Sequence, residues 1–162
     1  MITAYVGIDP GITGAVAVIP ERLESPMITD VPTYTNRKGK TEYDFYKMYK
    51  MLGKLSQEYE VHLCLEKQQA MTMQGVSSTF SIGRGYGAWE ALCWATTPNF
   101  QIVSPRKWKR FLGLTSDKDK SRELAITYFP GMMPLLKRKK DHNRAEALLL
   151  AYYSKISRGV NI

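Results

Sequence analysis

Four acidic residues occupy places in this sequence where carboxylates could perform metal-assisted chemistry. Asp9 and Glu66 each end a short apolar run, and Asp141 and Glu146 lie near the start of the last helix-forming segment. Converging carboxylates repel one another unless cations neutralise them, and Mg²⁺ takes a few carboxylates while leaving positions for water and phosphate oxygens. The pattern therefore predicts a phosphodiester-hydrolysing site with two metal ions about 3.5–4 Å apart.

The two acids that end apolar runs need strands to position them. Residues 6–18 predict a strand, a tight turn at Pro10–Gly11 and an antiparallel strand. Residues 61–67 predict a second apolar strand that ends in an acid. Taken alone, Asp9 could be ordinary Asp-Pro-Gly turn chemistry and Glu66 could pair with a neighbouring lysine. Two strands that each finish with a carboxylate instead bring both to one edge of a parallel sheet, where α/β active sites gather.

The rest of the chain predicts one α/β domain over residues 1–162. His142 and Glu146 are four residues apart and share a helix face, with Asp141 on an adjoining face. The other expected elements are a third strand over 27–34, a basic loop at 36–40, a helix over 41–59, a polar loop over 68–87, a buried helix over 89–94, a strand at 101–103, a helix from 104, a helix over 115–129 and a C-terminal helix over 141–153.

The charge balance indicates a polyanionic partner. Twenty-three Lys and Arg against fifteen Asp and Glu leave a net charge of +8, which is large for 162 residues and most simply indicates nucleic acid. The alternative is a basic surface kept for solubility. No apolar run approaches the roughly 18 residues of a membrane span, no signal peptide is evident, and Cys64 and Cys93 lie in apolar segments. We expect a cytoplasmic protein without membrane contact.

Several motifs, in order along the chain, carry a family resemblance. Residues 7–11 (GIDPG), the strand ending at Glu66 and residues 144–151 (RAEALLLA) resemble the RuvC family of Holliday junction resolvases. A branch of that family with phage resolvases and a chloroplast junction resolvase is more similar still in the middle of the chain, over 74–87, 103–109, 119–122 and 137–142.

This resemblance implies an RNase H-like fold, with a mixed five-stranded sheet flanked by helices. It implies a homodimer that makes paired nicks in four-way DNA junctions with two Mg²⁺ or Mn²⁺ ions per site and no nucleotide cofactor. The family's acids match Asp9 and Glu66, and we assign the last pair to Asp141 and Glu146. Many members carry the last two ligands three residues apart, where this chain has Asn143, so Asp141, His142 or Asn143 could complete the second metal site. We keep His142 as the alternative ligand, and a phage or prophage protein acting in a bacterial cell is expected.

The segment after Glu66 resembles the one that enters the junction centre in this family. Met71 and Phe80 are candidates for stacking on bases, although Phe80 could instead pack the loop onto the core. The run 137–140 could likewise be only a solvated face. The full set of expected DNA-binding residues is Met73, Gln74, Ser77, Ser78, Phe80, Arg84, Lys107, Lys118, Lys120, Lys137 and Lys140.

Three other functions compete with junction resolution. A broader nuclease for forks and flaps would keep the chemistry, and a non-catalytic junction-binding module would keep only the fold. Residues 7–14 also resemble the first phosphate loop of sugar kinases and actin-like ATPases. Those proteins need two lobes and a second phosphate loop, which these 162 residues do not supply.

Overall fold

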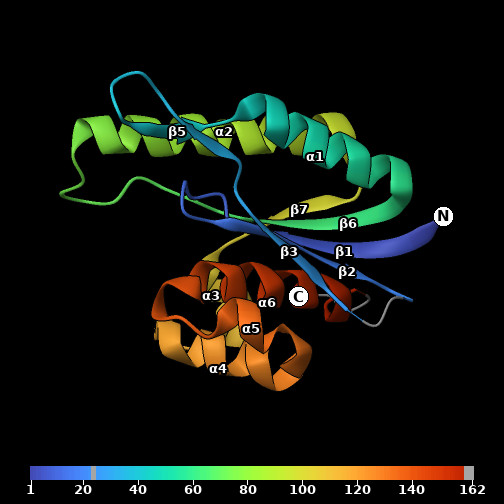
Figure 1. Cartoon of the computed structure of the whole chain (residues 1–162). Coiled ribbons are helices and arrows are strands. Elements are labelled where there is room, and N and C mark those ends of the chain that lie inside the picture. The colour runs from blue at the N-terminus through green and yellow to red at the C-terminus, as the bar shows by residue number, and fades with distance from the viewer. Residues whose placement is uncertain (23–24, 159–162) are drawn as a thin grey trace.

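A mixed five-stranded sheet forms the centre of the computed structural model, which describes residues 1–22 and 25–158 (Figure 1). The first strand along the chain is the central one. It pairs antiparallel with the second strand on one side and parallel with the sixth on the other, so both expected strand pairings and the expected mixed topology are confirmed. The strands, in spatial order, are β3 (Met27–Asp30), β2 (Ala15–Pro20), β1 (Ile2–Ile8), β6 (Tyr59–Glu66) and β7 (Phe100–Val103).

Helices cover both faces of this sheet (Figure 1). One face carries α1 (Phe45–Glu58) and α2 (Val76–Thr96). The other carries α3 (Pro105–Phe111), α4 (Lys118–Tyr128), α5 (Met133–Leu136) and α6 (His142–Ile156), with the short 3₁₀ helices η1 (Pro130–Met132) and η2 (Lys139–Asp141) between them. No helix among the described residues is long and apolar enough to cross a membrane.

Two apolar cores form because successive side chains of a strand point to opposite faces. On β1, Val6 and Ile8 face α1 and α2, whereas Tyr5 faces the side of α6. Gly7 lies against α6, and a Cβ there would overlap the helix backbone at Ala147 and Ala151. Glycine at this position therefore lets the backbone of α6 rest directly on the backbone of β1.

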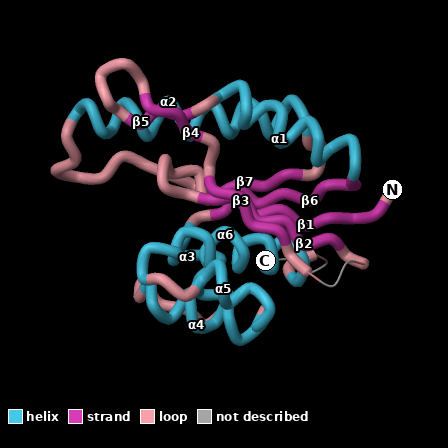
Figure 2. Tube along the Cα trace, in the orientation of Figure 1, coloured by secondary structure: helices cyan, strands magenta, loops and turns pink. Residues whose placement is uncertain are grey.

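The expected third strand is divided in two. β3 joins the main sheet, and β4 (Thr33–Thr35) pairs instead with β5 (Thr41–Tyr43) in a separate hairpin, whose tip is the basic segment 36–40 (Figure 2). Pro32 lies at the break, where its missing N–H prevents a continuous ladder. The helix expected from residue 41 begins only at Phe45, because the Asp44 side chain caps it by accepting a hydrogen bond from the Lys47 amide.

The polar loop expected over 68–87 ends much earlier than predicted. Helix α2 begins at Val76 and continues through the expected buried helix at 89–94. Glycines at 83, 85 and 87 lower the intrinsic helix propensity of this segment, but packing overrides it. A Cβ at Gly85 would overlap the ring of Tyr43, so this glycine lets the β4–β5 hairpin lie against the helix.

β7, α3, α4 and α6 lie close to their predicted bounds, whereas η1, α5 and η2 were not predicted. Ser104 caps α3 by accepting from the Lys107 amide, with Pro105 in the first turn, and Asp117 caps α4 by accepting from the Asp119 amide. These two helices bring the basic segments 105–111 and 118–128 to the same side of the sheet as α6.

Candidate active site

Asp9 and Glu66 emerge side by side at one edge of the sheet. β1 and β6 are parallel neighbours, and Ile8 is in register with Leu65, so the next residue of each chain segment carries its carboxylate to the same edge. Both acids are buried, with 8% and 9% of their surface exposed. The parallel pairing of β1 and β6 confirms the prediction that these two acids converge.

Glu146 joins them from the second turn of α6 and is equally buried. Burial raises the pKa of Asp9 to about 6, and the charge of Glu146 adds to the increase. Burial raises the pKa of Glu66 to about 7, with further contributions from the charges of Asp9 and Glu146. Asp9 and Glu66, two buried carboxylates with raised pKa values beside a third acid, form a site that is short of positive charge.

Three neighbouring side chains hold these carboxylates in place. Trp108 of α3 donates its indole N–H to Oε2 of Glu66 at 2.7 Å. The next residue, Lys109, places its ammonium 2.6 Å from Oε1 of Glu146, and Ser121 of α4 donates to the same oxygen at 3.4 Å. The sequence showed Trp108 only as an apolar residue among basic ones, because its partner depends on how α3 packs beside β6.

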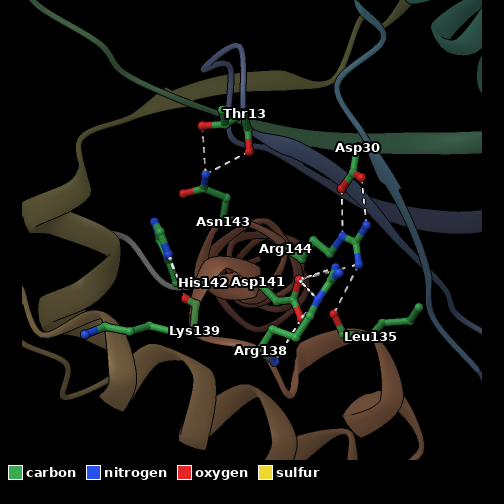
Figure 3. Close-up of polar contacts among 9 residues, drawn as sticks. All are labelled: Thr13, Asp30, Leu135, Arg138, Lys139, Asp141, His142, Asn143 and Arg144. Carbon is green, nitrogen blue, oxygen red and sulfur yellow. Dashed lines mark hydrogen bonds and ion pairs between the residues drawn. The ribbon is translucent and has the colours of Figure 1, made fainter.

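Asp141 is not brought to this cluster, contrary to expectation. Both of its carboxylate oxygens accept hydrogen bonds from Arg138, at 2.8 to 3.1 Å, and Arg144 lies 3.7 Å away (Figure 3). Arg144 in turn forms a two-armed ion pair with Asp30 of β3, with both N–O distances at 2.7 Å. These arginines hold the pKa of the Asp141 carboxyl below its usual range. We call Asp30, Arg138, Asp141 and Arg144 the arginine–aspartate network.

His142 and Asn143 take two further directions from the start of α6 (Figure 3). The charge of His142 contributes to lowering the pKa of Asp9. Its Nδ1 is 3.1 Å from the carbonyl oxygen of Lys139. Asn143 instead donates its amide to Thr13, in the turn between β1 and β2. Of the three candidates to complete the second metal site, His142 is the one whose charge acts on the pKa of Asp9.

All but one of the expected DNA-contact residues are exposed; Gln74 is partly buried. Met73 is fully exposed in a left-handed conformation (φ 64°) just before α2, and Phe80 is 73% exposed, so it does not pack into the core. A cavity of about 450 Å³ borders Glu66, Met71, Gln74 and Arg106. Exposed positions are also found for Ser77, Ser78, Arg84, Lys107, Lys118, Lys120, Lys137 and Lys140.

The acids are the ligand type that a hard divalent cation prefers, but their side chains are not arranged to coordinate one. Carboxylate oxygens with raised pKa values are ligands that a divalent ion would stabilise in their charged form. In residues 1–22 and 25–158, however, no group of three or more His, Cys, Asp or Glu side chains is arranged to hold an ion. Lys109 supplies a positive charge at Glu146 instead.

Comparison with known proteins finds similarity in both sequence and structure. No protein family model matches the chain. A 72-residue segment, 42% of this chain, is 43% identical to the chloroplastic Holliday junction resolvase MOC1 of Chlamydomonas reinhardtii, of whose length it spans only 8%. Over 98% of the chain and 97% of the other, the structure is similar to Thermus thermophilus RuvC in complex with a Holliday junction substrate, with a TM-score of 0.61 and 15% identity.

A second RuvC structure from Thermus thermophilus has a TM-score of 0.54 at 16% identity, over 96% of this chain and 97% of that one. Both comparisons cover the sheet and the helices on its two faces. The chain therefore has the RNase H-like fold of RuvC, and part of its sequence is similar to a Holliday junction resolvase.

Proposed function

We propose that this protein is a metal-dependent endonuclease that resolves four-way DNA junctions. The observation that carries the proposal is the convergence of three buried acids, Asp9, Glu66 and Glu146, on a RuvC-like fold, with burial raising the pKa values of Asp9 and Glu66. The sequence similarity to a named junction resolvase supports the same substrate class.

The acids and their neighbours have separable roles in this proposal. Asp9, Glu66 and Glu146 would hold two Mg²⁺ or Mn²⁺ ions, with His142 as the fourth ligand in place of Asp141. When bound, the ions would supply activation of a water and charge stabilisation at the phosphodiester. Trp108 orients Glu66 through its indole N–H. Lys109 orients Glu146 through its ammonium.

Substrate binding would use the basic and exposed surface around the acids. Arg84, Lys107 and the lysines of 118–120 and 137–140 would contact backbone phosphates, and Met73 and Phe80 would meet unstacked bases at the crossover. A homodimer would place two such sites on opposing strands and so make paired nicks. We place this activity in the cytoplasm of a bacterial cell, as a phage or prophage protein.

The test is a nicking assay on a labelled synthetic four-way junction with Mg²⁺, Mn²⁺ or chelator, next to duplex, fork and flap substrates. We expect symmetric, metal-dependent nicks near the crossover. Glu66→Gln should lower the nicking rate by about a hundredfold or more while junction binding persists. Glu60→Gln is the matched control, because it makes the same change at the exposed far end of the same strand.

Other outcomes would identify the competing functions. Equal cleavage of forks and flaps would indicate a broader branched-DNA nuclease. Junction binding without any nicking would indicate a non-catalytic module, and nicking that is unchanged by Glu66→Gln would remove the proposed site.

A further inference from the structure

Asn143 connects the start of α6 to the turn that carries Asp9. Its Nδ2 donates to the carbonyl oxygen of Thr13 at 2.7 Å and lies 3.1 Å from the Thr13 hydroxyl (Figure 3). A carbonyl oxygen can only accept, so the nitrogen of the Asn143 amide must face Thr13, and the orientation of this amide is fixed by its partner.

The turn that Asn143 holds is itself closed around Asp9. The Asp9 amide donates to the Ala15 carbonyl oxygen at 3.0 Å, and Oδ1 of Asp9 accepts from the Gly11 amide at 3.2 Å. The Gly14 amide donates to the Gly11 carbonyl oxygen at 2.8 Å. Thr13 lies inside this closed turn, so we expect a displacement of Thr13 to shift the Asp9 carboxylate.

The other end of the connection lies on the helix that carries Glu146. Asn143 is three residues before Glu146, one turn earlier on α6, and the helix backbone already rests on β1 at Gly7. The contact at Gly7 fixes how closely α6 approaches the strand. The Asn143–Thr13 contact adds a second point near the helix start, which limits sliding and rotation of α6 relative to the turn.

We propose that Asn143 is a positioning residue that sets the separation of Asp9 and Glu146, and that it is not itself a metal ligand. The inference rests on the proposed function, since it concerns the same acid site. It assigns a task to the position where the family resemblance leads one to expect a ligand.

Asn143→Asp separates these two roles. If position 143 were a ligand position, a carboxylate there would preserve nicking and lower the metal concentration needed for it. If Asn143 is the positioning residue, the new carboxylate faces the Thr13 carbonyl oxygen without a proton to donate, so Asn143→Asp should be at least as impaired as Asn143→Ala.

The experiment compares Asn143→Ala, Asn143→Asp and the control Ser154→Ala. Ser154 donates to the His62 carbonyl oxygen at 3.2 Å, so its loss removes the same kind of contact between α6 and the sheet, away from the acids. The readouts are amide hydrogen exchange over residues 9–15, the Mg²⁺ concentration for half-maximal nicking, the maximal nicking rate and junction affinity.

For both Asn143 variants we expect faster exchange over residues 9–15 and a maximal nicking rate lower by roughly ten- to a hundredfold. The half-maximal Mg²⁺ concentration should rise, with junction affinity within about twofold of the parent protein, since only the acids are displaced. Ser154→Ala should leave exchange over 9–15 and the metal requirement unchanged.

Preserved nicking at lower metal in Asn143→Asp would overturn the proposal, and so would unchanged exchange over 9–15 in Asn143→Ala. Hydrogen exchange needs neither DNA nor metal, so the connection can be tested even if the protein nicks no junction. Faster exchange with no nicking by the parent protein would retain the connection and reject the proposed function.

Discussion

Two groups of carboxylates flank the start of α6, and their electrostatics are opposite. In the acid cluster, Asp9 and Glu66 are buried with too little positive charge, and their pKa values are raised to about 6 and about 7. In the arginine–aspartate network, Asp30 and Asp141 have arginine partners, and their pKa values are lowered. The same residue type therefore costs folding free energy in one group and contributes stability in the other.

The two groups differ in how strongly their carboxylates would bind a cation. A carboxylate whose charge is already satisfied gains little from an added cation, whereas one kept from ionising by burial gains much. It also explains why Asp141, the nearest acid to Glu146 in sequence, is a structural residue in this arrangement.

Breaking the network should give the largest effect on stability. Arg144→Ala removes the two-armed partner of Asp30 and one of the two arginines at the buried Asp141. Because Arg138 stays paired with Asp141, we expect a loss near the lower limit for broken buried pairs, about 3 kcal/mol in the free energy of unfolding. Urea denaturation measures it. Arg106→Ala, at an exposed position on α3, is the control, and equal stability of the two variants would contradict a structural role for the network.

Neutralising an acid of the cluster should instead increase the free energy of unfolding. The pKa of Asp9 is about 6 in the folded protein and near 3.8 when unfolded, so the folded protein binds more protons between these values and loses stability as pH rises through them. Asn at position 9 avoids this loss. Without metal, Asp9→Asn should be more stable above pH 6, by about 1–3 kcal/mol, and show no gain below about pH 4.

Thermal unfolding at pH 4 and pH 8, in the presence of chelator, measures this difference. Adding Mg²⁺ at pH 8 should reduce it, because the ion stabilises only the protein that retains the carboxylate. A gain that is the same at both pH values would show that the Asp9 charge is not its source.

The smallest effect is expected at the exposed end of the network. Asp30→Asn removes a carboxylate that is more than half exposed, and solvent screens its pair with Arg144. We expect a loss of about 0.5–1 kcal/mol at neutral pH. The lowered pKa means that this contribution is present above the usual aspartate range and disappears as pH falls below it. Unfolding at low and high salt should show the loss shrinking with salt, and a loss that is independent of salt would contradict an ionic origin.

The sequence predicted the parts of the fold that depend on local pattern. Apolar strands that end in Asp9 and Glu66 are readable from residue types alone. Helix α2 was missed at its start because the glycine that weakens it, Gly85, is needed for a contact with Tyr43 that only the folded chain reveals.

At the site, too, local pattern predicted some features and tertiary contacts decided others. The convergence of Asp9 and Glu66 followed from strand order, whereas the direction of Asp141 depended on two arginines whose side chains reach it only after η2 and α6 are formed. Spacing along a helix places a residue on a face, but the nearest opposite charge decides where its side chain goes.

The contact between Gly7 and α6 has a consequence for the tolerance of the acid site. Most active-site groups are separated by packed side chains, and each one adds rotamer freedom to the distance between them. At position 7 no side chain intervenes between the strand of Asp9 and the helix of Glu146, because a Cβ there would already overlap the helix backbone. The spacing of the two main chains is thus limited by van der Waals contact alone, and any side chain added at position 7 would lift the entire helix from the sheet.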